Sequence, residues 1–160
     1  MSRPTLPPLL VLVGPTGVGK TAMAIQLAER LNGEIVSADS RYLYRYMDIG
    51  TAKPNPHERA RVPHHLIDVT TPDVPWSLAQ YQAEAFTTIG SIHARGHLPI
   101  LAGGTGQYVR AVVEGWQPPP SAQTPELRHS LETRLIHDGL DPLVAQLRGL
   151  DPESARTIDT

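Results

Sequence analysis

The pattern with the clearest chemistry lies near the N-terminus, at Gly14-Pro15-Thr16-Gly17-Val18-Gly19-Lys20-Thr21. It matches the phosphate-binding pattern G-x-x-x-x-G-K-[ST] at each fixed position. Glycines allow successive backbone N–H groups to turn toward an anion, and the start of a helix adds its positive end. Lys20 supplies a full positive charge, and the hydroxyl of Thr21 can bind Mg²⁺. The motif predicts a polyphosphate site without identifying ATP as the ligand.

Two further polar clusters follow predicted strands, at Ser37-Ala38-Asp39-Ser40-Arg41 and at Gly103-Gly104-Thr105-Gly106. Ligands of open α/β sheets bind at the carboxyl ends of the strands, so we expect both clusters to share one pocket with the phosphate loop. Asp39 would act there as a general base or metal partner, or it would cap the following turn. Thr105 would bond a phosphate or a bridging oxygen, or it would cap the next helix.

The remaining candidates have weaker chemical signals. Asp68 is expected to be structural rather than metal-binding, and His64 and His65 are adjacent, so they point in different directions and do not form one metal site. Lys53 either contacts phosphate or is solvated. Trp76 and Trp116 are expected to pack rather than stack on bases.

Arginines and tyrosines alternate between residues 41 and 61. The arginines are Arg41, Arg45, Arg59 and Arg61, and the tyrosines are Tyr42, Tyr44 and Tyr46. Guanidinium and aromatic groups on one segment suit RNA binding through phosphate contacts and base stacking. Both residue types are also common on ordinary protein surfaces, so this pattern alone leaves the two interpretations open.

Short apolar strands alternate with helical patterns through the first 115 residues. We expect strands at 9–13, 34–37, 66–69 and 98–102, and helices at 22–31, 78–92 and 107–114. Gly33 is expected to end the first helix, Ser77 to cap the second and Gly96 to end it, and 38–56 reads as a loop. This order predicts an α/β fold with a parallel sheet flanked by helices, similar to P-loop NTPases.

The sequence changes character after Gly115. A stiff break at Pro118-Pro119-Pro120 precedes helical patterns only, at 125–138, 142–150 and 152–158. Asp141-Pro142 and Asp151-Pro152 read as matched helix starts, with Asp as the cap and Pro in the first turn. We therefore divide the chain into an α/β core at 1–115 and a helical appendage at 116–160.

Composition excludes several classes of protein. The 160 residues carry a formal net charge of −2, so any contact with nucleic acid must be local. The absence of cysteine excludes disulfides and thiolate metal sites. No apolar run approaches the ~20 residues that a membrane-spanning helix needs, and Met1 to Pro8 do not resemble a secretory signal. We expect a soluble, cytoplasmic enzyme with no membrane partner.

Five segments together resemble the bacterial tRNA dimethylallyltransferases. The run Met47-Asp48-Ile49-Gly50-Thr51-Ala52-Lys53-Pro54 is the most specific of them. The others are the phosphate loop, Ser37-Ala38-Asp39-Ser40, Pro63-His64-His65-Leu66-Ile67-Asp68 and Gly103-Gly104-Thr105-Gly106-Gln107-Tyr108. The resemblance extends from Leu9 to the end of the chain. The family usually has about twice this length, so we expect an N-terminal part of such an enzyme.

The resemblance implies a reaction and a set of roles. A dimethylallyl group would pass from dimethylallyl diphosphate to the exocyclic N6 of the adenine next to the anticodon, in tRNAs that read codons beginning with U. Residues 14–21 would hold the diphosphate, with Lys20 neutralising its charge and Thr21 binding Mg²⁺. Asp39 would take the proton from N6, and Thr105 would assist at the bridging oxygen and meet the tRNA.

The remaining implied contacts are with tRNA. Ser40, Arg41 and Tyr42 match the segment that contacts the flipped-out adenine, and Arg128 matches a tRNA-contacting arginine in the helical insert. Many members carry Gln where this chain has Tyr42, and Tyr cannot make the same bidentate contact to an adenine edge. We expect the anticodon stem-loop to be the bound region and the protein to be a monomer.

Three other functions are considered. A small-molecule kinase would use the same loop for ATP, but no arginine-rich lid is evident and the run around Asp48 to Pro54 disfavours it. An adenylate prenyltransferase would perform the same chemistry on a free nucleotide, whereas the appended helices and Arg128 favour tRNA. The third is an inactive, truncated product that only binds diphosphate.

Overall fold

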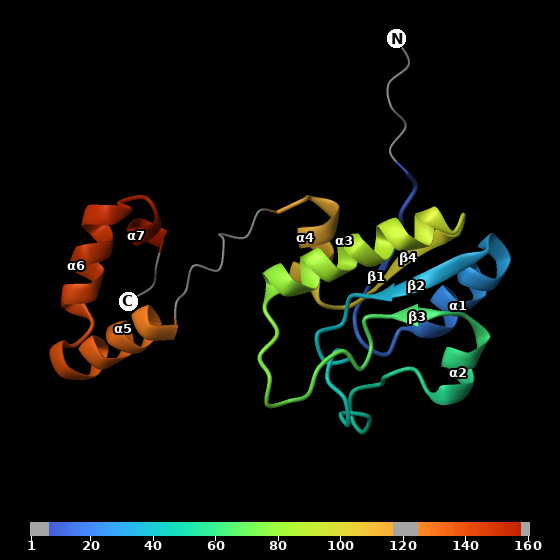
Figure 1. Ribbon diagram of the computed structural model, residues 1–160, viewed down its shortest axis with the longest axis horizontal. Coiled ribbons are helices and arrows are strands. Elements are labelled where there is room, and N and C mark those ends of the chain that lie inside the picture. Colours follow the sequence, from blue (N-terminus) through green and yellow to red (C-terminus); the bar gives the residue numbers. More distant parts are fainter. Residues whose placement is uncertain (1–6, 117–124, 158–160) are drawn as a thin grey trace, which may run out of the picture. The chain divides into compact units, whose positions relative to one another are not determined.

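The computed structural model describes residues 7–116 and 125–157 (Figure 1). The chain divides into two compact units, Met1–Pro118 and Pro119–Thr160. The expected break at Pro118-Pro119-Pro120 and the last residue of the expected final helix, Ile158, lie outside the described residues.

The first unit contains a four-stranded parallel sheet in the order β1-β4-β2-β3. Its strands are β1 (Leu10–Val13), β2 (Gly33–Ser37), β3 (His64–His65) and β4 (Leu98–Gly103). The helices of this unit are α1 (Lys20–Leu31), α2 (Pro56–Arg61), α3 (Leu78–Ala94) and α4 (Gly106–Val113). This architecture confirms the predicted α/β class.

Successive strand residues point to opposite sides of the sheet, so the two faces pack against different helices. Val36 and Leu101 point into a core that they share with α3 and α4. Their neighbours Ile35 and Ile100 point into a second core with α1. Figure 1 shows α3 and α4 over one face and α1 against the other. The carboxyl ends of β1, β2 and β4 consequently lie at one edge.

Several helix ends agree with the sequence patterns, and one does not. Ser77 caps α3 through a reciprocal pair of bonds with Gln80, and Gly96 adopts the expected left-handed φ of 76°. Gly33 does not end α1, since Asn32 takes that role with φ 51°. Gly33 instead begins β2, where a Cβ atom would lie 2.9 Å from the Leu98 carbonyl oxygen.

The third strand and one helix differ from expectation. The predicted strand at 66–69 is wrong: the strand is His64–His65, and Leu66 and Asp68 have φ values of 60° and 58° that interrupt an extended run. Helix α2 was not predicted. Asn55 caps it by accepting from the Glu58 N–H, with Pro56 in its first turn, so its start signal was present in the sequence.

The second unit contains α5 (Pro125–Asp138), α6 (Asp141–Leu150) and α7 (Ser154–Thr157). Asp141 is not the cap of α6, because Leu140 occupies that position without a side-chain bond. Asp151 does cap a turn, since its Oδ1 accepts from the Ser154 N–H at 3.0 Å. None of the side chains described in this unit belongs to a buried core.

No helix within the described part of the chain is both long and apolar enough to cross a lipid bilayer.

Candidate active site

The phosphate loop connects β1 to α1 and has the backbone that its glycines predict. Gly17 and Gly19 have φ values of 86° and 85°, which side chains disfavour. Gly19 also caps α1 without a side-chain hydrogen bond, so the first N–H groups of the helix face the loop rather than a capping side chain. The Nζ of Lys20 donates to the Pro15 carbonyl at 2.6 Å, which leaves further ammonium protons for an anion.

The segment that carries Asp39 is fixed to the end of β4. The Ala38 N–H donates to the Ala102 carbonyl at 2.8 Å, and the Thr105 N–H donates to the Ala38 carbonyl at 3.0 Å. The backbones of these two segments approach so closely that a Cβ atom on Gly103 would overlap the Ala38 carbonyl oxygen. Only glycine fits at position 103, and this contact sets where Asp39 stands beside the phosphate loop.

Thr105 contacts the same segment through its side chain. Its Oγ1 accepts from the Ser40 N–H at 3.0 Å and donates to the Ser40 Oγ at 3.3 Å. Thr105 is the N-cap residue of α4, as one of its two expected roles required, but its side chain makes no capping bond to that helix. Thr105 therefore positions the residue that follows Asp39.

The carboxylate of Asp39 is held at one oxygen. Oδ1 accepts from the Arg41 N–H at 3.0 Å, which is the turn contact weighed from the sequence. Oδ2 has no hydrogen-bond partner within the described residues, so it is available to take a proton. Burial and then the nearby charge of Asp39 raise the pKa of the Tyr42 phenol, whose hydroxyl donates to the Ala52 carbonyl at 2.5 Å.

These elements enclose a cavity of about 280 Å³. One part of its wall comes from the phosphate loop and the start of α1, and Asp39 and Tyr42 also line it. The rest is largely apolar and includes Ala24, Ile35, Pro54, Ile67 and Ala102. Such a cavity can hold an anionic head at the loop and a small hydrocarbon group against the sheet.

His64 is a cavity residue that the sequence did not indicate. The β2–β3 pairing places it opposite Ile35, and both line the cavity. Its Nδ1 lies 2.8 Å from the Val62 carbonyl, while its buried Nε2 has no hydrogen-bond partner among the described residues. Burial lowers the pKa of the imidazole. A two-residue strand is too short to show a periodic pattern, so nothing local placed His64 in the wall. His65 instead bonds Glu34 at 2.6 Å.

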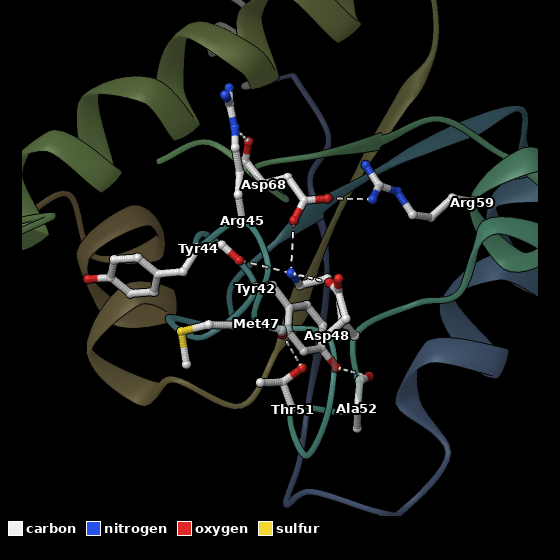
Figure 2. Close-up of polar contacts among 10 residues, drawn as sticks. Tyr42, Tyr44, Arg45, Met47, Asp48, Thr51, Ala52, Arg59 and Asp68 are labelled. Carbon is white, nitrogen blue, oxygen red and sulfur yellow. Dashed lines mark hydrogen bonds and ion pairs between the residues drawn. The ribbon is translucent and has the colours of Figure 1, made fainter. Parts of the chain in front are cut away.

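Lys53 has neither of the roles expected for it. Its side chain is only 3% exposed, and its Nζ donates to Asp48, Asp68 and the Tyr44 carbonyl at 2.8, 2.8 and 2.9 Å. Figure 2 labels these three partners. Arg59 binds the second oxygen of Asp68 at 2.6 Å. Burial alone would lower the pKa of Lys53, but the bonds to Asp48 and Asp68 raise it. Lys53 is thus a structural cation, and Asp68 is structural as expected.

Other predicted residues lie around the cavity or apart from it. Thr16, Gly17, Gly19, Lys20 and Thr21 line it, whereas Gly14, Pro15 and Val18 complete the loop outside the lining. Ser40, Arg41 and Thr105 are not part of the cavity wall.

Arg128 and the two tryptophans also lie outside the cavity. Arg128 belongs to α5 in the second unit, where it pairs with Glu132 at 2.9 Å. Trp76 packs against the core, and Trp116 lies under the Arg110 guanidinium.

Two family models match the chain. The model described as IPP transferase matches residues 42–160, and the model described as Isopentenyl transferase matches residues 7–70. Together they span both the phosphate loop and the helical appendage.

Curated relatives are similar along nearly the whole chain. The tRNA dimethylallyltransferase of Roseiflexus castenholzii is 57% identical over 151 residues, which is 94% of this chain and 49% of the relative. That of Methylococcus capsulatus is 52% identical over 158 residues, which is 99% of this chain and 50% of the relative. The chain thus spans about half the length of the curated relatives it matches.

Solved structures show the same partial coverage. The tRNA isopentenylpyrophosphate transferase of Bacillus halodurans is 45% identical with a TM-score of 0.68, over 94% of this chain and 50% of that one. A eukaryotic dimethylallyltransferase described as acting on tRNA is 29% identical with a TM-score of 0.81, over 96% of this chain and 38% of that one.

Proposed function

We infer the function from one premise, which is that the chain belongs to the IPP transferase family. We propose that the protein transfers a dimethylallyl group from dimethylallyl diphosphate to N6 of the adenine next to the anticodon of a tRNA. The names of its relatives support this reaction. The observation that carries the proposal is the single cavity in which a phosphate loop, a carboxylate and an apolar wall meet.

The phosphate loop would hold the leaving group. When the bond between C1 of the dimethylallyl group and its oxygen breaks, negative charge develops on the diphosphate. Lys20 and the N–H groups at the start of α1 would stabilise that charge. The apolar wall around Ile35 and Ile67 would orient the hydrocarbon and exclude water from the reacting carbon.

Asp39 would complete the transfer by removing a proton. The adenine N6 forms the new bond to C1 and must lose one proton, which passes to the free Oδ2 of Asp39. The bond from the Arg41 N–H holds the other oxygen, so the carboxylate keeps one orientation during the step. Tyr42 lies beside Asp39 and would contact the adenine by stacking or by a single hydrogen bond.

The wall also suits Mg²⁺. No cluster of three or more metal-ligating side chains occurs within the described residues, so such an ion would rely on diphosphate oxygens, water and the Thr21 hydroxyl. That ligand set is ordinary for Mg²⁺ bound with a polyphosphate, and the ion would supply charge neutralisation to the leaving group.

The remaining parts of the proposal concern partners. The anticodon stem-loop would be the region of tRNA that binds, with Arg128 as a contact from the helical unit. The enzyme would act as a monomer in the cytoplasm, where it meets tRNA.

Transfer of labelled dimethylallyl to an anticodon stem-loop RNA tests the proposal. We expect label in the RNA with Mg²⁺, and at least a hundredfold loss of rate in Lys20→Ala and Asp39→Asn, in line with losing a charge stabiliser or a general base. Arg30→Ala in the same helix and Asp73→Asn, both exposed and outside the cavity wall, are the matched controls. Near-normal rates in both site variants, or ATP hydrolysis without transfer, would reject the proposal.

A further inference from the structure

A second cavity of about 520 Å³ lies beside the first and shares Pro54 with it. Its wall contains the cations Arg45, Lys53 and Arg59 and the carboxylates Asp48 and Asp68. Both carboxylates are bonded to Lys53 or Arg59. Three cations against two carboxylates leave one positive charge, and that charge belongs to Arg45.

Arg45 is fixed in place yet not neutralised. Its backbone N–H donates to the Thr70 carbonyl at 2.8 Å, and its Nε donates to the Asp68 carbonyl at 2.8 Å (Figure 2). Its terminal nitrogens have no partner in the part of the chain that the structure describes, and no carboxylate there lies within ion-pair distance. A positioned guanidinium with free donors fits a phosphate group.

Tyr46 follows Arg45 and lines the same cavity, with 82% of its surface exposed. Its φ of 66° lies in the left-handed region, which a large side chain occupies only at a cost. An exposed aromatic ring held in a strained conformation contributes little to the core. Such strain is concentrated at functional sites.

Three other arginines and tyrosines of this segment are already engaged. Arg61 pairs with Glu29 and Arg59 with Asp68, while the Tyr42 hydroxyl bonds Ala52 and its ring lines the first cavity. Arg45 and Tyr46 are adjacent in the sequence, both are exposed, and both line the second cavity.

We propose that Arg45 and Tyr46 form a docking platform for a nucleotide of the substrate RNA adjacent to the adenine that enters the first cavity. The Tyr46 ring would stack on a base, and the Arg45 guanidinium would contact a backbone phosphate. The shared wall at Pro54 puts the platform next to the cavity that would hold the adenine. The proposal rests on the proposed function, since it assumes that the substrate is RNA.

Binding of a fluorescein-labelled anticodon stem-loop RNA to the chain, followed by anisotropy, tests the platform. We expect Tyr46→Gly to bind about tenfold more weakly, while Tyr46→Phe, which keeps the ring and the backbone strain, stays within about twofold. Glycine accepts a φ of 66° freely, so the melting temperature of the Tyr46→Gly variant should lie within a few degrees of that of the parent. A loss of RNA affinity in this variant therefore reports on binding and not on unfolding.

The salt dependence isolates the arginine. Arg45→Gln can still donate to the Asp68 carbonyl but lacks the charge, and it should reduce the slope of log affinity against log salt by about 0.7–0.9, the contribution of one phosphate contact. A merely structural Arg45 would leave that slope unchanged. All three variants should bind dimethylallyl diphosphate as the parent does.

Three results would overturn the platform. They are parent-like RNA affinity in Tyr46→Gly, an equal loss in Tyr46→Phe, and no RNA binding by the parent itself. Parent-like affinity in every variant would point to a different partner for this surface, such as a protein. The first two outcomes are separate from the proposed function, whose failure would appear as lost donor binding in the same samples. Absence of RNA binding by the parent would count against both the platform and the proposed function.

Discussion

Lys53 illustrates how one side chain can be misassigned from sequence and corrected by its contacts. It sits in the most specific run of the chain and near the phosphate loop, where a lysine commonly binds phosphate. Its Nζ is instead saturated by two carboxylates and a carbonyl. The sequence could not show this, because Asp68 lies 15 residues away and meets Lys53 only after the loop has folded.

Removing the charge of Lys53 should therefore lower stability and spare donor affinity, whereas removing the charge of Lys20 should do the reverse. Lys53→Met leaves Asp48 and Asp68 without their shared cation, and we expect the free energy of unfolding to fall by about 2–3 kcal/mol. Its affinity for dimethylallyl diphosphate should stay within about threefold of the parent. Lys20→Met should lose donor affinity and keep its stability. Urea unfolding and donor titration on both variants measure this, and a donor defect in folded Lys53→Met would refute the structural role.

Glu34 governs a second response, to pH. Its side chain is 3% exposed and accepts from Arg95, His65 and His97. The hydrogen bonds from Arg95, followed by those from the histidines, overcome burial and lower the pKa of Glu34 from 4.5 to about 2. A lowered pKa means that this stabilisation is complete above the unfolded-state pKa and is lost as pH falls toward the folded-state pKa.

The expected loss is about 2 kcal/mol of unfolding free energy between pH 5 and pH 3. Glu34→Gln keeps hydrogen-bonding capacity but does not titrate. Between pH 5 and pH 3 its unfolding free energy should therefore fall by about 2 kcal/mol less than that of the parent. Urea unfolding of both proteins at the two pH values measures the difference. Parallel decline in the two proteins would show that Glu34 does not carry the effect.

At the scale of elements, the junction of β2 and β4 determines whether the site forms. Gly103 allows β4 to reach the Ala38 carbonyl, and Thr105 then anchors Ser40 on the other side of Asp39. Gly106 is three residues later, and no atom of the described residues would lie within 4 Å of a Cβ atom placed there. The two glycines therefore provide a matched pair.

Gly103→Ala should lower the unfolding free energy by at least about 2 kcal/mol and reduce donor affinity, because its Cβ would overlap the backbone that positions Asp39. Gly106→Ala should leave both quantities nearly unchanged. Thermal unfolding and donor titration of the two variants distinguish them. Equal tolerance of both substitutions would contradict the close approach of β4 to Ala38.

Elements with their own start and stop signals could be predicted, and contacts between elements could not. The capping pair Ser77 and Gln80 predicts the start of α3 from local sequence. The phosphate loop predicts the start of α1 in the same way. β3 has two residues, and its pairing with β2 depends on tertiary contacts. Asp39 could be identified because it follows a strand that the sequence predicts. The place of His64 in the cavity wall could not, because it depends on the pairing of β3 with β2.

At the scale of the whole molecule, the two units contribute differently. The first contains the phosphate loop, Asp39 and both of the cavities described above, all between residues 14 and 103. The second presents amphipathic helices whose apolar side chains, such as Leu131 and Leu143, line a groove of about 340 Å³. The claim of a prenyl-donor site in the first unit can therefore be tested through donor binding by the chain.

The most direct test is calorimetric titration of the chain, in the presence of Mg²⁺, with dimethylallyl diphosphate, inorganic diphosphate and ATP. The apolar wall should bind the hydrocarbon at up to ~0.8 kcal/mol per buried CH₂ group, so dimethylallyl diphosphate should bind at least about tenfold more tightly than diphosphate. It should also bind more tightly than ATP. Tighter binding of ATP, or equal binding of dimethylallyl diphosphate and diphosphate, would contradict a prenyl-donor site.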